Sequence, residues 1–289
     1  PFIRKAAGFG VASLDPDPDR YEHQYEHCDI LVVGSGPSGL SSALAAAKNG
    51  ARVILAEDKP RFGGSLLIDE VTIGNKKGEE WVDDVVSELN SMPNVITKSR
   101  SQVFGYYDHN MLVMSERVSD HLPKTDKYIP KQRLWYIRAK EVVISSGSIE
   151  RPLVFGNNDA PGVMLSSAAK EYLKVYGVLV GKKPIIFTNN DSGYETAIEF
   201  KKNGIDAIIL DTRKEANSEI IKEAKELNIN IKFSYVVVAA KGYKKVNSAD
   251  IAKLSDNKKN ISNIENIKCD CICVSGFWTP TIHLASQSG

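Results

Sequence analysis

The stretch Asp29-Ile-Leu-Val-Val-Gly-Ser-Gly-Pro-Ser-Gly39 decides the fold, because it joins a short apolar strand directly to a glycine-rich turn. An alanine-rich helical pattern runs from Leu40 to Asn49, and a second apolar strand follows and ends at Glu57. A strand, a G-x-G-x-x-G turn, a helix and a strand with an acidic end make up the βαβ unit of dinucleotide-binding domains. The sequence therefore predicts a nucleotide-binding α/β domain.

Each glycine of the turn has its own physical task. Gly34 permits the sharp turn, Gly36 lets a pyrophosphate approach the backbone, and Gly39 lets the helix pack closely on the strand. The N–H groups and the dipole at the helix start then bind phosphate. Glu57 accepts hydrogen bonds from a ribose diol, and its charge repels a phosphate at the ribose 2′ position. We therefore expect NAD or FAD rather than NADP.

Later segments are expected to approach the same dinucleotide. The stretch Arg61-Phe-Gly-Gly-Ser-Leu66 brings a second glycine pair just after Glu57, and Ser146 and Gly147 follow another apolar strand. Val103 falls where a third strand would pass the adenine, although a place in the ordinary core explains it equally well. The predicted cofactor-binding residues are Gly34, Ser35, Gly36, Pro37, Ser38, Gly39, Glu57, Asp58, Lys59, Arg61, Gly63, Gly64, Ser65, Val103, Ser146 and Gly147.

The composition describes a chain large enough for two domains, because 289 residues can bury a sizeable core. Its 37 basic and 36 acidic residues leave a net charge of +1, which provides no overall attraction for nucleic acid or an anionic membrane. No apolar run reaches the length of a membrane span, and the N-terminus lacks the pattern of a secretory signal. We therefore expect a cytoplasmic protein without nucleic-acid or membrane partners.

The cysteines and histidines provide no catalytic or metal site. Cys269, Cys271 and Cys273 alternate, so they are expected to share one face of a strand as buried thiols rather than to form a metal cluster. The histidines lack sequence partners for a metal site or a nucleophile–base pair; they are His23, His27, His109, His121 and His283. We predict no catalytic residue and no metal ligand in this chain.

A second α/β block follows, but its phosphate turn differs. Its turn Thr188-Asn-Asn-Asp-Ser-Gly193 retains a single glycine, so side chains and the charge of Asp191 stand where a pyrophosphate would approach. Asp191 suits the N-cap of the next helix. We expect this block not to bind a nucleotide, and Asp211-Thr-Arg213 is only a weak ribose signal. The expected elements are helices at 192–203 and 215–227 and strands at 184–187, 205–210 and 229–233.

The rest of the chain predicts a leader, further elements and a division into domains. Residues 1–28 show no periodicity and are interpreted as an extended linker. The first domain is expected to comprise residues 29–155 with 275–289, and the second residues 156–274. Because the chain opens at Pro1 without methionine, we expect a fragment of a longer protein. The other expected elements are helices at 79–92 and 166–176, a hairpin of 102–107 and 111–114, a strand pair of 133–138 and 141–145, a hairpin of 235–240 and 243–246, a solvated loop at 253–266 and a closing strand at 267–275.

Longer motifs carry a family resemblance. Together with the glycine turn they cover nearly the whole chain, which resembles the α subunit of heterotetrameric sarcosine oxidase. The resemblance implies an α/β fold with a three-layer ββα Rossmann-like FAD/NAD(P)-binding domain and an inserted second Rossmann-like domain, similar to pyridine nucleotide-disulphide oxidoreductases. The motifs are Arg4-Lys-Ala-Ala-Gly-Phe-Gly10, Glu116-Arg-Val-Ser-Asp-His-Leu122, Ser148-Ile-Glu-Arg-Pro-Leu-Val-Phe155, Pro161-Gly-Val-Met164, Phe187-Thr-Asn-Asn-Asp-Ser192 and Val274-Ser-Gly-Phe-Trp-Thr-Pro280.

The resemblance also implies cofactors and partners. In that family the α subunit holds NAD in its glycine-turn domain without turnover, and sarcosine is oxidised at a non-covalent FAD in the β subunit. Electrons pass to a covalent FMN at the α–β boundary, dioxygen becomes hydrogen peroxide, and a later α domain passes the methylene group to tetrahydrofolate. We therefore expect NAD in the first domain, FAD and FMN outside this chain, and three partner subunits, β, γ and δ. This piece alone is not expected to oxidise sarcosine.

Three alternatives stay open at this point. An autonomous flavin-dependent pyridine nucleotide reductase needs FAD on the first turn and NAD(P)H on the second, and the altered second turn argues against it. An α subunit of an opine or hydrogen-cyanide-forming oxidase is similar over this region and binds FAD in the same place. A nucleotide-free interaction subunit is disfavoured by the intact glycines of the first turn.

Overall fold

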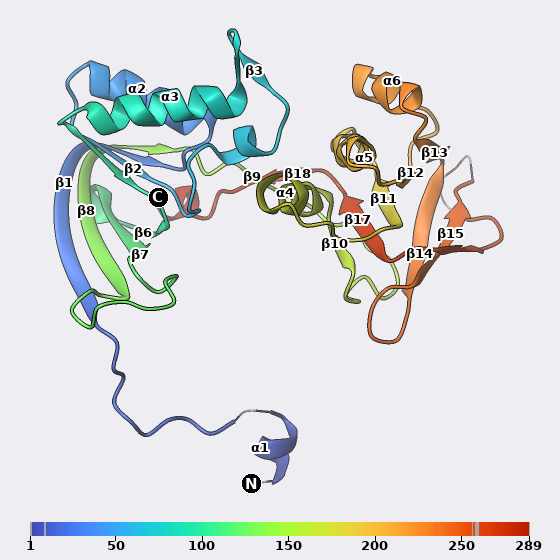
Figure 1. Ribbon diagram of the computed structural model, residues 1–289, viewed down its shortest axis with the longest axis horizontal. Coiled ribbons are helices and arrows are strands. Elements are labelled where there is room, and N and C mark those ends of the chain that lie inside the picture. Colours follow the sequence, from blue (N-terminus) through green and yellow to red (C-terminus); the bar gives the residue numbers. More distant parts are fainter. Residues whose placement is uncertain (1, 9, 256, 258–259, 289) are drawn as a thin grey trace. The chain divides into compact units, whose positions relative to one another are not determined.

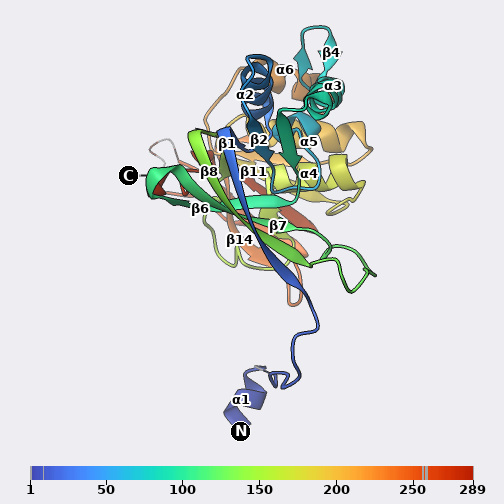
Figure 2. The same cartoon turned by 90° about the vertical axis from the view of Figure 1, so that its left-hand side faces the viewer.

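The computed structural model describes residues 2–8, 10–255, 257 and 260–288 (Figures 1 and 2). By its internal contacts the chain divides into two units. The first unit comprises Pro1–Phe62, Val85–Ser145 and His283–Gly289, and the second comprises Gly63–Asp84 and Ser146–Ile282. The second unit therefore interrupts the chain of the first, and each unit is described by itself below.

Parallel strands form the centre of the first unit, and an antiparallel meander lies on one of their faces (Figure 1). The parallel strands are, in spatial order, β5 (Val95–Lys98), β2 (Val53–Ala56), β1 (Tyr21–Val33) and β8 (Gln132–Ile144). The meander continues from β8 to β7 (Met111–Arg117) and β6 (Ser101–Tyr107), with a 3₁₀ turn at Asp108–Asn110. On the opposite face lie α2 (Pro37–Lys48) and the C-terminal half of α3 (Gly78–Ser91).

The core of the first unit is drawn from segments far apart in the sequence. It combines Leu31 of β1, Ile54 of β2 and Ile137 of β8 with Leu284 near the end of the chain. Each buried side chain of this size contributes about 2 kcal/mol to folding. Close to Leu284, the Gln287 carboxamide oxygen accepts the backbone N–H of Tyr106 at 2.9 Å. The last described residues are therefore an integral part of the first unit.

The second unit repeats the three layers. Helices cover one face of a parallel sheet and a small antiparallel sheet covers the other, each over its own apolar cluster. The parallel strands are, in spatial order, β10 (Val163–Leu165), β17 (Cys271–Ser275), β11 (Pro184–Thr188), β12 (Ile208–Asp211) and β13 (Asn230–Phe233). The helices are α4 (Ser166–Tyr176), α5 (Ser192–Lys202) and α6 (Glu219–Glu226), and the small sheet is β14 (Tyr235–Lys241), β15 (Ser248–Lys253) and β16 (Glu265–Lys268).

Short elements complete the described chain. They are α1 (Phe2–Ala6), the 3₁₀ turns Gly64–Leu67 and Ala285–Gln287, the hairpin of β3 (Thr72–Ile73) and β4 (Lys76–Lys77), and the antiparallel pair of β9 (Ser148–Glu150) and β18 (Trp278–Pro280). Among the described residues, no helix combines the length and the apolar composition needed to cross a membrane. The predicted fold class, a three-layer Rossmann-like part with a second Rossmann-like part inserted into it, is confirmed.

The contacts draw the boundaries of the two units differently from the predicted domains, residues 29–155 with 275–289 and residues 156–274. Residues 146–155 and 275–282 join the second unit, because β9 and β18 pair with each other and the Trp278 indole N–H donates to the Ser192 hydroxyl at 2.8 Å. Contact density alone does not define an independently folding domain. The domain limits therefore stay a prediction.

The linker expected over residues 1–28 is too long. Residues 21–28 form the first half of β1 and pair with β8 from Tyr21 opposite Gln132 onward. Both strands run side by side over their full length in Figure 2. The missing periodicity has a physical cause: backbone hydrogen bonds hold this pair, while the exposed faces carry polar and aromatic side chains such as the stacked Tyr25 and Tyr136.

Three further strand predictions were wrong. The expected pair of 133–138 and 141–145 is the single strand β8, since no turn residue interrupts it. The partner of β14 is β15 at 248–253 rather than 243–246. The closing strand expected at 267–275 is broken between β16 and β17, where the Asp270 carboxylate accepts the backbone N–H groups of Lys182 and Lys183 at 2.8 Å each.

The cysteine prediction was right about burial and wrong about geometry. All four cysteines are free and buried. Cys271 and Cys273 share the helix-covered face of β17, with their sulphur atoms 3.6 Å apart. Cys269 lies outside the strand, in the cluster of the opposite face. Residues 256, 258 and 259 of the loop expected at 253–266 lie outside the described residues, and the rest of that segment includes the ends of β15 and β16.

The remaining elements lie close to their predicted places. The helices at 166–176 and 192–203 correspond to α4 and α5, and the hairpin around 108–110 to β6 and β7. Two elements are shorter than expected: the strand at 205–210 begins at Ile208, and the helix at 215–227 begins at Glu219. These predictions are confirmed because long segments with one clear period are the easiest to assign.

Candidate functional site

The glycine turn joins the end of β1 to the start of α2. Gly34 has a φ of +94°, in the left-handed region that glycine adopts without strain. A Cβ on Gly39 would lie 1.9 Å from the Gly34 carbonyl oxygen, so only glycine lets the helix start pack on the turn. A Cβ on Gly36 would meet no atom of the described residues within 4 Å. The turn thus combines a left-handed position, a tightly packed one and an open one.

The start of α2 provides hydrogen-bond donors beside the open position. Gly36 is the N-cap and Pro37 the first helical residue, where the missing N–H of proline costs nothing. The N–H groups of Ser38 and Gly39 have no acceptor within the helix, because they belong to its first turn. No acidic residue lies in that turn. The donors and the positive end of the helix dipole therefore favour an anion here.

Glu57 directly follows β2 at the same edge of the sheet, since β1 and β2 pair in parallel up to their last residues. Its side chain is 6% exposed. Oε2 accepts the Ser35 backbone N–H at 2.9 Å and the Ser35 hydroxyl at 2.5 Å, and Oε1 accepts the Lys59 N–H at 3.0 Å. Burial, followed by contact with the Asp58 carboxyl, raises the pKa of Glu57. The carboxyl group is therefore fixed against the glycine turn.

The residues after Glu57 follow the surface of the first unit. Asp58, Lys59 and Arg61 are all exposed. The Lys59 carbonyl oxygen accepts the N–H of Arg100 at 2.9 Å, and the Glu57 carbonyl oxygen accepts the N–H of Ser101 at 2.7 Å, so this segment is tied to the start of β6. The structure brings these residues together with the glycine turn, and their contacts with a cofactor stay a prediction.

Val103 lies on a different strand from the one expected. The parallel strand next to β2 is β5, whereas Val103 belongs to the antiparallel β6, where it packs half-buried against the core of the first unit. The hairpin expected at 102–107 and 111–114 already contains Val103, and the structure agrees with the hairpin rather than with a third parallel strand at this residue. The predicted contact of Val103 with an adenine stays untested.

The other predicted residues belong to the second unit. Gly63 has a φ of +126°, which strongly favours glycine, and Gly64, with a φ of +55°, begins the 3₁₀ turn that contains Ser65. The Ser146 hydroxyl donates to the Thr281 carbonyl oxygen at 2.8 Å, and the Gly147 carbonyl oxygen accepts the Thr281 N–H at 3.0 Å. These backbone positions are well defined within their unit, and their part in cofactor binding stays a prediction.

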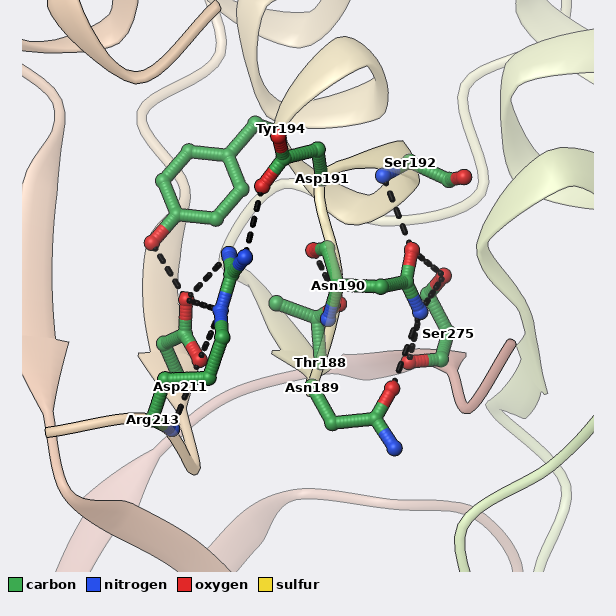
Figure 3. A network of polar contacts seen from close by, with 9 residues as sticks. All are labelled: Thr188, Asn189, Asn190, Asp191, Ser192, Tyr194, Asp211, Arg213 and Ser275. Carbon is green, nitrogen blue, oxygen red and sulfur yellow. Dashed lines mark hydrogen bonds and ion pairs between the residues drawn. The ribbon is translucent and has the colours of Figure 1, made fainter. Parts of the chain in front are cut away.

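The turn of the second unit is filled by its own side chains (Figure 3). Asp191 occupies the N-cap position of α5 but makes no capping hydrogen bond; its carboxylate pairs with Arg213 at 2.7 Å. Asn190 caps the helix instead, because its Oδ1 accepts the Ser192 N–H at 2.9 Å. Asp191 therefore lies at the predicted N-cap position, but its side chain does not cap the helix, because it pairs with the charge of Arg213, 22 positions away in the sequence.

The first turn fits the adenosine diphosphate half of a dinucleotide. The position of Gly36 is open, first-turn donors lie beside it, and the Glu57 carboxyl directly follows the neighbouring strand. NAD and FAD share this half, so the residues fit both. Among the described residues, no group of three or more histidine, cysteine or acidic side chains has the geometry of a metal site. The chemistry that this arrangement supports is cofactor holding.

Comparison with known proteins agrees with this geometry. The model of a family described as pyridine nucleotide-disulphide oxidoreductase matches residues 28–289. The chain belongs to this family. Proteins of the pyridine nucleotide-disulphide oxidoreductase family are oxidoreductases whose fold holds FAD or NAD(P). Thioredoxin reductase from T. acidophilum has the same fold, with a TM-score of 0.67, 16% identity, and coverage of 90% of this chain and 80% of that chain.

Two kinds of curated relative match more than half of the chain, and they are named as subunits of sarcosine oxidase and of opine oxidase. The sarcosine oxidase alpha subunit of Rhizobium meliloti (strain 1021) is 41% identical over 290 residues, which cover 100% of this chain and 28% of the relative. The A subunit of opine oxidase from Agrobacterium tumefaciens (strain Ach5) is 27% identical over 172 residues, which cover 55% of this chain and 33% of the relative. The resemblance to sarcosine oxidase α subunits is confirmed, and the chain spans less than a third of their length.

Sequence reasoning missed the polar network of the second turn. It named Asp191, Asp211 and Arg213 separately and did not connect them with Asn190, Tyr194 or Ser275. A usable signal exists, because Asp211 and Arg213 are two residues apart at a strand end and so point to the same side of the sheet. The pairing of Arg213 with Asp191 depends on the parallel register of β11 and β12, which the sequence does not reveal.

Proposed function

We propose that this chain forms the dinucleotide-holding part of the α subunit of a sarcosine-oxidising complex, with NAD bound at the first unit. The observation that carries the proposal is the open Gly36 position beside the fixed carboxyl group of Glu57. Whole-chain similarity to proteins named as alpha subunits of sarcosine oxidase supports the choice of reaction.

The residues of the first unit hold the dinucleotide by its adenosine diphosphate half. First-turn N–H groups of α2, those of Ser38 and Gly39, take the phosphates, and Glu57 accepts the ribose hydroxyls. Ser35 keeps the Glu57 carboxyl group in place through its hydroxyl and N–H groups. The remaining predicted contacts of the first unit, those of Asp58, Lys59 and Arg61, flank the bound molecule. When bound, a nicotinamide or flavin ring supplies a hydride acceptor.

The oxidation itself takes place outside this chain. We assign no catalytic residue to it, and we propose that the β subunit carries the FAD, that the covalent FMN lies at the α–β boundary, and that γ and δ subunits complete a cytoplasmic heterotetramer. Sarcosine is then demethylated to glycine, dioxygen is reduced to hydrogen peroxide, and tetrahydrofolate accepts the methylene group in another part of the α subunit. This chain alone does not oxidise sarcosine.

A second candidate is the α subunit of an opine-type amine oxidase with FAD in the same place. The similarity to the A subunit of opine oxidase favours it, although that match covers only 55% of this chain. Because Glu57 and the glycine turn serve both cofactors, the bound molecule itself separates the two candidates.

Purified protein tests the proposal directly. We expect a colourless preparation that releases NAD on denaturation, identified by chromatography and mass spectrometry of the supernatant. A yellow preparation that releases FAD would favour the opine-type candidate. A preparation without any nucleotide, after expression together with the candidate partner subunits, would contradict both.

A further inference from the structure

A network of polar side chains occupies the carboxyl edge of the second unit's parallel sheet (Figure 3). This edge lies at the ends of β11, β12 and β17, and it is where a Rossmann-like fold receives a dinucleotide. We call this network the internal polar cluster; it consists of Thr188, Asn190, Asp191, Tyr194, Asp211, Arg213 and Ser275.

Two of the first-turn donors that a phosphate would need are already bonded, since the Asp191 carbonyl oxygen accepts the N–H of Tyr194 at 3.0 Å and a side chain accepts that of Ser192. Asn190 Oδ1 accepts the N–H of Ser192, the first residue of α5, at 2.9 Å. The Asn190 Nδ2 donates in turn to the carbonyl oxygen and hydroxyl of Ser275 at 3.1 and 3.3 Å. A pyrophosphate would therefore have to displace a side chain bonded on both sides and then lie next to the Asp191 carboxylate.

The acceptor for a ribose is also used. Asp211 ends β12, at a place comparable to that of Glu57 directly after β2, and the Asp211 side chain is 0% exposed. It accepts the Tyr194 hydroxyl at 2.7 Å, the Arg213 backbone N–H at 2.9 Å and the Arg213 Nη2 at 2.8 Å. The same guanidinium group reaches Asp191 with its Nη1 at 2.7 Å. Arg213 therefore connects the ribose side to the phosphate side.

Trp278 lies against the start of the same helix. Its indole N–H donates to the Ser192 hydroxyl at 2.8 Å, and the ring is 38% exposed. The single glycine left in the turn, Gly193, serves packing, because a Cβ there would lie 2.8 Å from the Thr188 Cβ. The Ser192 hydroxyl at the helix start is therefore already bonded, and the glycine that remains is the one that the fold itself requires.

We propose that the second unit binds no dinucleotide. Asn190 is bonded to the Ser192 N–H that a pyrophosphate would need, and Arg213 is bonded to the Asp211 carboxylate that a ribose would need. Family membership implies a pyridine nucleotide at this place, and the residues do not fit one. Electrons from NAD(P)H therefore have no entry through the second unit, and a single dinucleotide is bound per chain. The closure of the second unit does not depend on the proposed function of the first, whereas the count of one dinucleotide per chain rests on it.

Nucleotide counting tests the inference in the full-length protein. We expect one dinucleotide per chain in the unchanged protein. A Gly36→Val variant is then dialysed against NADH or NADPH at millimolar concentration, and we expect it to bind neither. Bound NADH or NADPH in that variant would overturn the inference, and the proposed function of the first unit would still stand. A Gly36→Val variant that keeps its co-purified nucleotide would instead contradict the proposed function of the first unit.

Reopening the turn gives a second, independent measurement. The triple variant Asn190→Gly, Asp191→Gly and Arg213→Ala, made on the Gly36→Val background, should bind NADH at least about tenfold more tightly than that background does. Asn228→Gly, an exposed change in the same unit, serves as the control and should bind no better than the background.

The nucleotide content of the first unit shows whether the triple variant is folded. The same triple change made with Gly36 intact should retain the nucleotide of the first unit at one per chain. If the first unit keeps its nucleotide and the reopened second unit gains no affinity for NADH, closure by Asn190 and Arg213 is wrong. If the first unit loses its nucleotide as well, the single variant Arg213→Ala replaces the triple one, with the same gain expected and the same result overturning the inference.

Discussion

The two units have the same fold, but the turn position that is open at Gly36 in the first unit carries a bonded side chain, that of Asn190, in the second. In the first unit a Cβ at Gly36 would meet nothing described within 4 Å, whereas in the second unit Asn190 and Asp191 fill the turn with bonded side chains. Both units keep a glycine where the helix packs on its turn, at Gly39 and at Gly193. The packed glycine is therefore needed by the fold in both units, whereas the open glycine at Gly36 has no packing role.

The carboxylates at the two strand ends, Glu57 and Asp211, differ in the donors that hold them. Glu57 is held by the hydroxyl and N–H groups of Ser35, which are neutral donors. Asp211 is held by the guanidinium group of Arg213, a permanent charge within the protein. Neutral donors can share a carboxylate with a ribose, whereas a buried ion pair resists the loss of either partner. The contrast can be tested by changing one residue at a time.

The largest effect is expected for Gly36 and Gly39, two of the three glycines of the first turn. Gly36→Val should weaken dinucleotide binding by about 100-fold or more, because the side chain fills the space of the pyrophosphate. Its backbone, with a φ of −64°, suits any residue, so the free energy of unfolding should change by less than about 0.5 kcal/mol.

Gly39→Ala is the matched control for that prediction. Its Cβ would lie 1.9 Å from a backbone oxygen, so the protein should lose about 3 kcal/mol or more of stability. Urea unfolding and nucleotide content together separate the two variants. Equal behaviour of Gly36→Val and Gly39→Ala in both measurements would mean that the open and packed positions do not differ.

An intermediate effect is expected for the ion pairs of the second unit. Arg213→Ala should lower the free energy of unfolding by about 2 kcal/mol, because it leaves Asp211 buried with fewer donors. Tyr194→Phe should cost about 1 kcal/mol, and the exposed Arg138→Ala less than about 0.5 kcal/mol. The nucleotide content of the first unit should stay unchanged in all three. Urea unfolding curves give the order, and an Arg213→Ala variant as stable as Arg138→Ala would contradict it.

The smallest effect concerns the pH dependence of Glu57. Burial raises its pKa in the folded chain, so the stability that the neutral form contributes at acid pH is lost as the pH rises through that raised value. In nucleotide-free protein, the unfolding free energy of the wild type should therefore fall with pH, above the ordinary carboxyl pKa of about 4.3, more steeply than that of Glu57→Gln. Urea unfolding at a series of pH values measures the difference. Parallel curves for the two proteins would rule out the raised pKa.

Sequence reasoning captured the parts of this molecule that depend on local pattern. The turn from Gly34 to Gly39, the helix that follows it and the acidic strand end at Glu57 are all short-range features with one clear period or spacing. The same holds for α4 and α5, whose bounds agree with the expected ones within one residue. The three-layer fold followed from the resemblance that these motifs support.

What the sequence did not reveal depends on long-range pairing. The first half of β1 is set by its register with β8, more than one hundred residues later, and its own side chains carry no alternation. The pairing of Asp191 with Arg213 needs two strand ends to meet at one edge of the sheet. Such contacts are decided by tertiary structure, so local propensity has no information about them.

The placement of Leu284 in the core of the first unit has a consequence for biosynthesis. The ribosome makes most of the first unit's strands early, but the residue that completes their apolar cluster, and the Gln287 that bonds to Tyr106 across 181 positions, arrive only after residues 146–282. Contacts of such long sequence separation form slowly, and domains generally fold as they emerge. The second unit is therefore free to fold on the ribosome before residues 283–288 reach the first unit.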